Sequence, residues 1–337
     1  MKNEMQYREL GNSGLKASVF GLGTFAIGGW FWGGTDEKDS IKAIQGSIDN
    51  GVNLIDTAPI YGYGLSEEIV GKALKGRRDR AIIATKGGLV WNTEKGDFHT
   101  HADDAGPTGE PSKYKIYQYL GPESLRQEVE DSLKRLQTDY IDLYQTHWQD
   151  STTPIEETMG ALNDLKKQGK IKAIGVCNVT PEQLKEYRKY GDIVSVQEKF
   201  SLIDRAVEKK GLVDYCVENN LSILSYFTIE QGLLSGKMSP SRKFDDGDTR
   251  KGNPLFSAEN VTKVNSILKE LEPFAKKYEV NLIQLVIALT AAQRGITHVL
   301  IGARNEKQAR ENLVGGEIHI DPNDLKDMNK IAEKLQK

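Results

Sequence analysis

The chain has 337 residues, of which 38% are hydrophobic and 28% charged, and its formal net charge at pH 7 is −3. Because its basic and acidic residues are interspersed, neither nucleic acid nor an anionic membrane surface is expected as the main partner. The first ten residues lack the apolar core of a signal peptide, and no run of about 18 apolar residues occurs that would span a membrane. These features predict a cytoplasmic protein that acts on small molecules.

Strand and helix patterns alternate along the sequence after a predicted N-terminal hairpin at 7–18. Apolar runs predict strands at 19–23, 52–56, 81–85, 141–145, 171–176, 193–197, 222–226 and 298–302. Helical patterns follow at 36–50, 66–74, 122–136, 154–168, 181–190, 208–219 and 306–314, with helical sequence up to residue 293 after the seventh strand and a terminal helix at 322–335.

The number of alternations favours a closed (β/α)8 TIM barrel, formed as a single domain over 1–337 with an N-terminal hairpin and additional C-terminal helices. A doubly wound open sheet is the structural alternative. Two connections are longer than ordinary loops. Residues 92–120 are interpreted as a loop that roofs a pocket, and residues 235–257 as a functional loop.

A metal site and a Rossmann site are both disfavoured. The five histidines show no HExxH or comparable ligand spacing, and Cys177 and Cys216 are expected to be structural thiols. Gly21, Gly23 and Ala26 match a dinucleotide-binding glycine pattern, but no helix begins directly on these glycines as that motif requires. No metal is therefore expected.

Four ionisable side chains stand at or just beyond the ends of three consecutive predicted strands: Asp56, Tyr61, Lys86 and His147. In parallel α/β proteins the carboxyl ends of the strands face the ligand. Singly, each residue has an ordinary structural explanation. Together they suit hydride reduction of a carbonyl, with Lys86 paired to Asp56 and its ammonium lowering the pKa of the tyrosine, the proton donor.

Three segments carry a resemblance to a known family. They are DTAPIYGYGLSE at 56–67, RLQTDYIDLYQTHW at 135–148 and IGARNEKQARENL at 301–313. The sequence resembles the aldo-keto reductase superfamily nearly from end to end, and most closely its bacterial branch related to inositol-utilisation reductases. The resemblance implies a barrel that binds NADPH across its C-terminal rim. Tyr61 would be the general acid, Lys86 held by Asp56 would tune it, and His147 would orient the carbonyl.

The same resemblance implies a set of cofactor-binding residues. Asn178 and Gln197 would hold the carboxamide and Tyr226 would stack on the nicotinamide. The remaining cofactor contacts would be Gly23, Thr24 and Asp56, then Gln231, Gly232, Leu233 and Lys237 along the pyrophosphate, and Gly302, Arg304, Gln308, Glu311 and Asn312 at the adenosine half. Arg250 would add a phosphate contact as its loop closes. Arginine suits a ribose 2′-phosphate, so NADP is favoured over NAD.

The substrate is predicted less sharply. Trp30, Trp32 and Trp148 are candidate substrate contacts that would stack on a sugar, a polyol or a related hydroxycarbonyl compound, although packing residues are an equal alternative. The oligomeric state is not readable. Two alternatives to a reductase are a regulatory subunit that binds the cofactor with little turnover, as channel β-subunits share this architecture, and an aldolase that uses Lys86 as a Schiff base.

Overall fold

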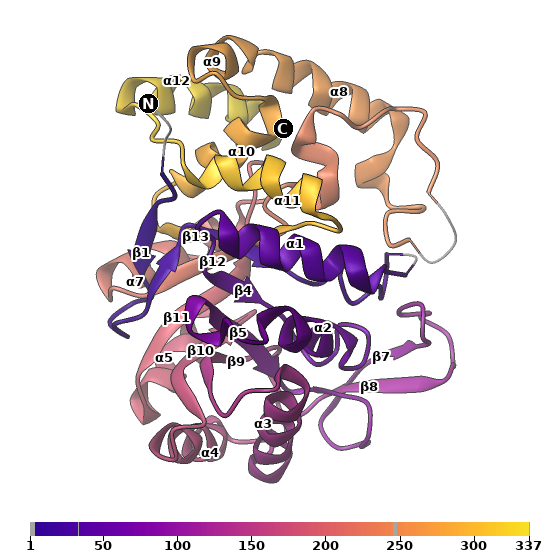
Figure 1. Ribbon diagram of the computed structural model, residues 1–337, viewed down its shortest axis with the longest axis vertical. Coiled ribbons are helices and arrows are strands. Elements are labelled where there is room, and N and C mark those ends of the chain that lie inside the picture. The colour runs from indigo at the N-terminus through magenta and orange to yellow at the C-terminus, as the bar shows by residue number, and fades with distance from the viewer. Residues whose placement is uncertain (1–3, 33, 245–247, 337) are drawn as a thin grey trace.

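The computed structural model describes residues 4–32, 34–244 and 248–336, and within these ranges eight parallel strands close into a barrel (Figure 1). Their order around the barrel is their order in the chain: β3 (Phe20–Gly23), β4 (Leu54–Asp56), β5 (Ile82–Gly87), β9 (Ile141–Thr146), β10 (Ile171–Cys177), β11 (Ile193–Lys199), β12 (Ser222–Tyr226) and β13 (Ile296–Gly302). The last strand pairs with the first, so the sheet has no edge. The predicted (β/α)8 barrel is confirmed, and the doubly wound alternative is wrong.

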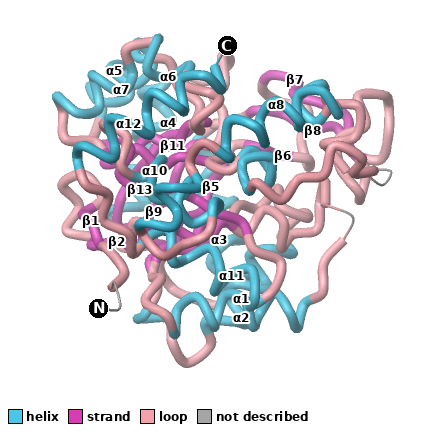
Figure 2. Tube along the Cα trace, turned by 90° about the horizontal axis from the view of Figure 1, so that it is seen from above, coloured by secondary structure: helices cyan, strands magenta, loops and turns pink. Residues whose placement is uncertain are grey.

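Helices surround the strands on all sides (Figure 2). They are α1 (Glu37–Asp49), α2 (Leu65–Leu74), α3 (Pro122–Leu136), α4 (Ile155–Lys167), α5 (Pro181–Tyr190), α6 (Ala206–Lys209), α7 (Leu212–Glu218), α8 (Ala258–Lys269), α9 (Glu272–Lys277), α10 (Leu282–Ala291), α11 (Glu306–Leu313) and α12 (Pro322–Ala332). The helix predicted at 208–219 is two helices, because Gly211 adopts a left-handed φ of 74° between them. None of the helices in the described ranges has the length and apolar character to cross a bilayer.

The N-terminal hairpin closes one end of the barrel. Strands β1 (Tyr7–Glu9) and β2 (Lys16–Ser18) pair antiparallel, as the sequence predicts. Leu10 and Ala17 are fully buried against the inward-facing side chains of the barrel strands, among them Leu54, Leu143 and Leu224. The hairpin therefore forms the barrel floor.

The segment predicted as a long loop at 92–120 contains two strands. Strands β6 (Leu89–Val90), β7 (Asp97–Ala102) and β8 (Tyr114–Gln118) form a separate antiparallel sheet in the order β6-β8-β7. Its strands lie near one another in the chain. The polar residues of β7 hide the alternation of apolar and polar side chains that would have predicted a strand. In both Figure 1 and Figure 2 the β7–β8 ribbon lies at the opposite end of the molecule from the hairpin.

The second long connection, predicted at 235–257, follows a short 3-10 segment, η2 (Glu230–Ser235). Another, η3 (Pro254–Phe256), precedes α8. Residues 245–247 of the predicted loop lie outside the described residues. On both sides of them the chain contacts the rim of the barrel that faces away from the hairpin.

Candidate active site

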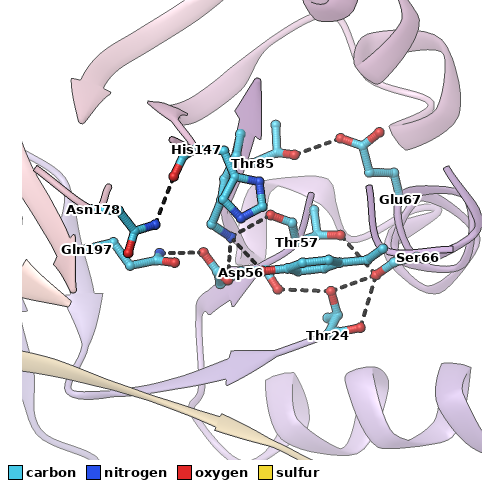
Figure 3. A network of polar contacts seen from close by, with 11 residues as sticks. Thr24, Asp56, Thr57, Ser66, Glu67, Thr85, His147, Asn178 and Gln197 are labelled. Carbon is cyan, nitrogen blue, oxygen red and sulfur yellow. Dashed lines mark hydrogen bonds and ion pairs between the residues drawn. The ribbon is translucent and has the colours of Figure 1, made fainter. Parts of the chain in front are cut away.

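A network of polar contacts at the rim includes Asp56, Gln197, Thr24 and Ser66 (Figure 3). It also contains a buried lysine. Lys86 projects inward from β5, and its Nζ lies 2.8 Å from Asp56 Oδ1, 2.9 Å from the Thr57 carbonyl oxygen and 3.3 Å from the Tyr61 hydroxyl. Both members of the Lys86–Asp56 ion pair are buried. Because an ammonium has three donors, these three acceptors satisfy it completely.

The carboxylate of Asp56 is held on its other side by Gln197. The Gln197 Nε2 group donates to Asp56 Oδ2 over 2.8 Å. From below, the Thr24 hydroxyl donates to the Asp56 carbonyl oxygen over 2.9 Å and lies 2.7 Å from Ser66 Oγ. Through Thr24, Asp56 is thus connected to Ser66 in the first turn of α2.

The pKa of Tyr61 differs from the sequence prediction. Burial raises the pKa of this hydroxyl to about 12, and the ammonium of Lys86 opposes that rise without overcoming it. The predicted net lowering is therefore wrong, although the predicted effect of Lys86 has the right sign. Burial also acts to lower the pKa of Lys86, but the charges of Asp56 and Tyr61 outweigh it and the net shift is upward. At neutral pH the phenol is protonated and the lysine is charged.

His147 lies beside Tyr61, with 5.9 Å between the ring centroids and 81° between the ring planes. Burial, and then the charge of Lys86, lowers the pKa of His147 well below its usual range, so its imidazole is neutral at pH 7. The His147 carbonyl oxygen accepts a 2.9 Å hydrogen bond from Asn178 Nδ2, and Asn178 Oδ1 accepts one of 2.8 Å from the Tyr226 hydroxyl. The sequence-predicted residues therefore form one connected network.

Close backbone packing positions Tyr61. A methyl group at Gly28 would lie 2.6 Å from the Tyr61 carbonyl oxygen, closer than real contacts allow. The Phe25 ring packs against the Tyr61 ring with 4.8 Å between centroids. The rim loop after β3 can approach the tyrosine only because residue 28 has no side chain.

These residues open into a cavity of about 600 Å³. The sequence-predicted residues that line it are Gly23, Trp30, Trp32, Asp56, Tyr61, His147, Trp148, Asn178, Gln197, Tyr226, Gln231, Gly232, Lys237, Arg250, Gly302, Arg304, Gln308, Glu311 and Asn312. The cavity therefore extends from the tyrosine to the first turns of α11. Such a length suits an extended ligand.

Three predicted residues do not line the cavity. Lys86 lies beneath Tyr61, and Thr24 serves the Asp56 backbone. Leu233 is fully buried in the apolar cluster formed with α8 and α10. The side chains of Thr24 and Leu233 point into the protein, so their contact with a cofactor, which stays a prediction, would come from the backbone.

Arg250, the predicted phosphate contact, is already paired within the protein. Its guanidinium pairs with Asp248 over 2.6 Å and donates to the Gln231 carbonyl oxygen over 3.2 Å. It also lies over the rings of Trp32 and Phe244, 5.1 and 4.6 Å from their centroids. Arg250 therefore ties its loop to the aromatic rim with its charge already balanced.

Two further cations, Lys237 and Arg304, were predicted to contact the cofactor. Lys237 forms an ion pair with Glu311. Arg304 is exposed, and its Nη2 donates over 3.0 Å to the Gly34 carbonyl oxygen. Among the described residues no carboxylate pairs with Arg304. The same ranges contain no cluster of three side chains that would ligate a metal.

Sequence reasoning missed several aromatic and apolar wall residues, among them Phe25, Ile60, Leu89 and Ile116. The β6–β8 sheet contributes His99, Thr100 and Ile116 to the wall. Trp30 is largely buried, and its Nε1 donates to the Asp103 carbonyl oxygen over 3.2 Å. It joins the rim loop to the sheet, so packing dominates its role. His99, Thr100 and Ile116 reach the cavity only through the pairing of β7 with β8.

Residues 19–333 match the Aldo/keto reductase family. The chain belongs to this family. It is similar to the aldo-keto reductase YhdN of Bacillus subtilis (39% identity, covering 98% of this chain and 94% of the relative). It is also similar to the NADH-specific methylglyoxal reductase of Escherichia coli (39% identity, 97% and 98% coverage).

Solved aldo-keto reductase structures share the barrel. A glycerol dehydrogenase from Gluconobacter oxydans superposes with a TM-score of 0.83 at 34% identity, covering 98% of this chain and 95% of the other. An aldo-keto reductase from Bacillus halodurans gives a TM-score of 0.76 at 30% identity, with 99% and 97% coverage. The family assignment derived from the sequence motifs is therefore confirmed.

Proposed function

We propose that this aldo-keto reductase interconverts an aldehyde or ketone and the corresponding alcohol, with Tyr61 as general acid and base. The observation that carries the proposal is the fully buried Lys86 ammonium 3.3 Å from the Tyr61 hydroxyl, at the base of a cavity that His147 also lines. A buried charge aimed at a phenol stabilises the phenolate that proton transfer produces.

A bound nicotinamide cofactor supplies the hydride. In reduction, Tyr61 donates its proton to the carbonyl oxygen, and Lys86 stabilises the phenolate that remains. The neutral imidazole of His147 donates a hydrogen bond to the same oxygen. In oxidation, the Tyr61 phenolate accepts the proton of the alcohol. Asp56 keeps Lys86 charged and positioned throughout.

We further propose NADP as the preferred cofactor. The donor set fits a dinucleotide, because Asn178 and Tyr226 line the cavity near Tyr61 while Gln308 and Asn312 line it at α11. Arg304 lies at that far end without a carboxylate partner among the described residues, and a guanidinium suits a 2′-phosphate. The E. coli relative is named NADH-specific, so membership of the family does not by itself decide between NADP and NAD.

We propose a small oxygenated carbonyl compound or polyol as the substrate. The cavity wall near Tyr61 is aromatic and apolar, with few polar groups. Such a wall admits a small carbonyl compound or a polyol. Relatives are named for methylglyoxal and glycerol, which are small oxygenated compounds of this kind.

The Tyr61→Phe variant tests the function. Its ring keeps the contact with Phe25, but the transferable proton is lost, so kcat should fall by about 10²- to 10⁴-fold. The dissociation constant for NADPH, measured by quenching of intrinsic fluorescence, should stay within about threefold.

Tyr63→Phe is the matched control. It removes a hydroxyl that donates to the Asp103 carbonyl oxygen, and turnover should be retained. A Tyr61→Phe variant with wild-type kcat would show that another group is the acid. NADPH binding without turnover of any compound in a carbonyl and polyol panel would instead favour a regulatory role.

A further inference from the structure

His99 is the extra residue of a β-bulge at the cavity wall. In the β7–β8 ladder Phe98 pairs with Tyr117 and Thr100 pairs with Ile116, so His99 has no partner of its own on β8. A bulge bends the strand and redirects the side chain, and bulges are frequent next to active sites. Here the redirected side chain lines the cavity.

The imidazole of His99 lies against the catalytic rim. Its ring is 5.6 Å from that of Trp148, the residue after His147, and the planes are tilted by 42°. The neighbouring wall is apolar, formed by side chains such as Leu89, Pro107 and Ile116. A polar group in such a wall selects the orientation of a small ligand.

The hydrogen bond on the other side of the ring determines the tautomer. Gln118 Nε2 lies 2.9 Å from His99 Nδ1, and an amide NH₂ group only donates. Nδ1 must therefore accept, which places the imidazole proton on Nε2. Partial desolvation against the cavity wall lowers the pKa of His99, so the ring is neutral at pH 7 and has one donor.

We propose that His99 Nε2 donates a hydrogen bond to an oxygen on the carbon next to the reacting carbonyl, and that His99 thereby selects 2-hydroxy and 2-oxo carbonyl compounds. This inference rests on the proposed function. Tyr61 and His147 hold the reacting oxygen, and His99 provides a separate donor for the vicinal oxygen. His99 is exposed on β7, so with a simple aldehyde this donor binds water and does not help to hold the substrate, which lowers the rate of turnover relative to the oxygenated compound.

The test compares matched substrates that differ only at the neighbouring position. They are glycolaldehyde against propanal and methylglyoxal against 2-methylpropanal. The wild-type protein should show a higher kcat/KM for the oxygenated member of each pair. His99→Phe keeps an aromatic ring against Trp148 but has no donor, so it should lose about tenfold or more of this preference while kcat/KM for propanal stays within about threefold.

His101→Phe is the control on the same strand. His101 is not among the residues that line the cavity, so the preference should be unchanged. Gln118→Leu removes the hydrogen bond that fixes the tautomer of His99. It should therefore reduce the preference for oxygenated substrates, but by less than His99→Phe does. Nitrogen-15 NMR of the wild-type imidazole should show the Nε2–H tautomer.

Three results would overturn the proposal. An Nδ1–H tautomer would remove the donor from the cavity. A His99→Phe variant that loses activity equally for both members of each pair would make His99 merely structural. A variant that keeps the preference would assign selection to another residue. In the last two cases, turnover of propanal by the wild-type protein would still support the proposed function. If the wild-type protein turned over no substrate at all, both the proposed function and the role of His99 would be contradicted.

Discussion

Lys86 directs each of its three donors to a different acceptor: a carboxylate, a backbone carbonyl oxygen and the Tyr61 hydroxyl. Removing one partner of such a buried pair leaves an uncompensated charge, which costs several kcal/mol. The net upward shift of the Lys86 pKa also keeps the amine protonated. A Schiff base at this lysine is therefore disfavoured, because a protonated amine is not a nucleophile.

At the same scale, Arg304 is expected to determine cofactor preference. Arg304→Ala should raise KM for NADPH by about tenfold or more, because a charge-assisted hydrogen bond to the 2′-phosphate is lost. KM for NADH should change by less than about twofold. Steady-state kinetics with both cofactors measures this, and Arg310→Ala, which removes an arginine paired with Glu306 on α11, is the control. Equal effects on both cofactors would contradict the assignment.

Among the elements, α3 supports the insertion through one half-buried carboxyl group. Glu128 on α3 accepts hydrogen bonds from the Gly88 backbone N–H over 2.9 Å and from Ser124 Oγ over 3.2 Å. Gly88 joins β5 to β6, so this contact anchors the start of the sheet that carries His99. Burial raises the pKa of Glu128 to about 7.

This raised pKa predicts a pH-dependent stability. The folded state holds the Glu128 proton up to about pH 7, whereas the unfolded chain releases it near 4.5, so the free energy of unfolding should fall as pH rises between these values. Glu128→Gln should remove this part of the slope and be more stable than wild type above pH 7, by about 1 to 3 kcal/mol.

Urea unfolding at several values between pH 5 and pH 8 measures the slope. The exposed Glu123→Gln on the same helix should leave it unchanged. An unchanged slope in Glu128→Gln would mean that this carboxyl group titrates alike in the folded and unfolded states.

At the scale of the whole molecule, the residues that close the barrel and the residues that line the cavity lie at opposite ends of the barrel axis. The hairpin of β1 and β2 closes one end (Figure 1). The cavity opens at the other. In (β/α)8 barrels residues at the floor contribute to stability, and loops at the opposite rim carry the ligand site. Substitutions at the two ends should therefore have separable effects.

Leu10→Ala tests this separation. Leu10 is fully buried in the floor, so the variant should lose about 2 to 5 kcal/mol of unfolding free energy while kcat/KM stays within about twofold. Denaturant unfolding and steady-state kinetics provide both numbers. The partly buried Leu15→Ala should lose less. A large loss of kcat in folded Leu10→Ala would show that the two ends are coupled.

Much of the fold and the site was predictable because the signals are local. Each barrel strand is a short apolar run, and Asp56, Lys86 and His147 lie at or just after strand ends in the sequence itself. The β6–β8 sheet was missed because its exposed strand β7 has polar residues and its pairing joins segments separated by a long turn. His99 could be found only through that pairing, since nothing in its neighbours distinguishes it from His101.

The sequence by itself determined the barrel and the family, and it predicted the cluster of Asp56, Tyr61, Lys86 and His147, because periodicity and motif spacing are properties of neighbouring residues. Tertiary structure decided quantities that depend on the surroundings. Burial, set by residues from several strands, reverses the expected shift of the Tyr61 pKa. Asp248 balances the charge of Arg250, and the bulge in β7 turns His99 toward the cavity. Desolvation and pairing act through space, so no local pattern in the chain records them.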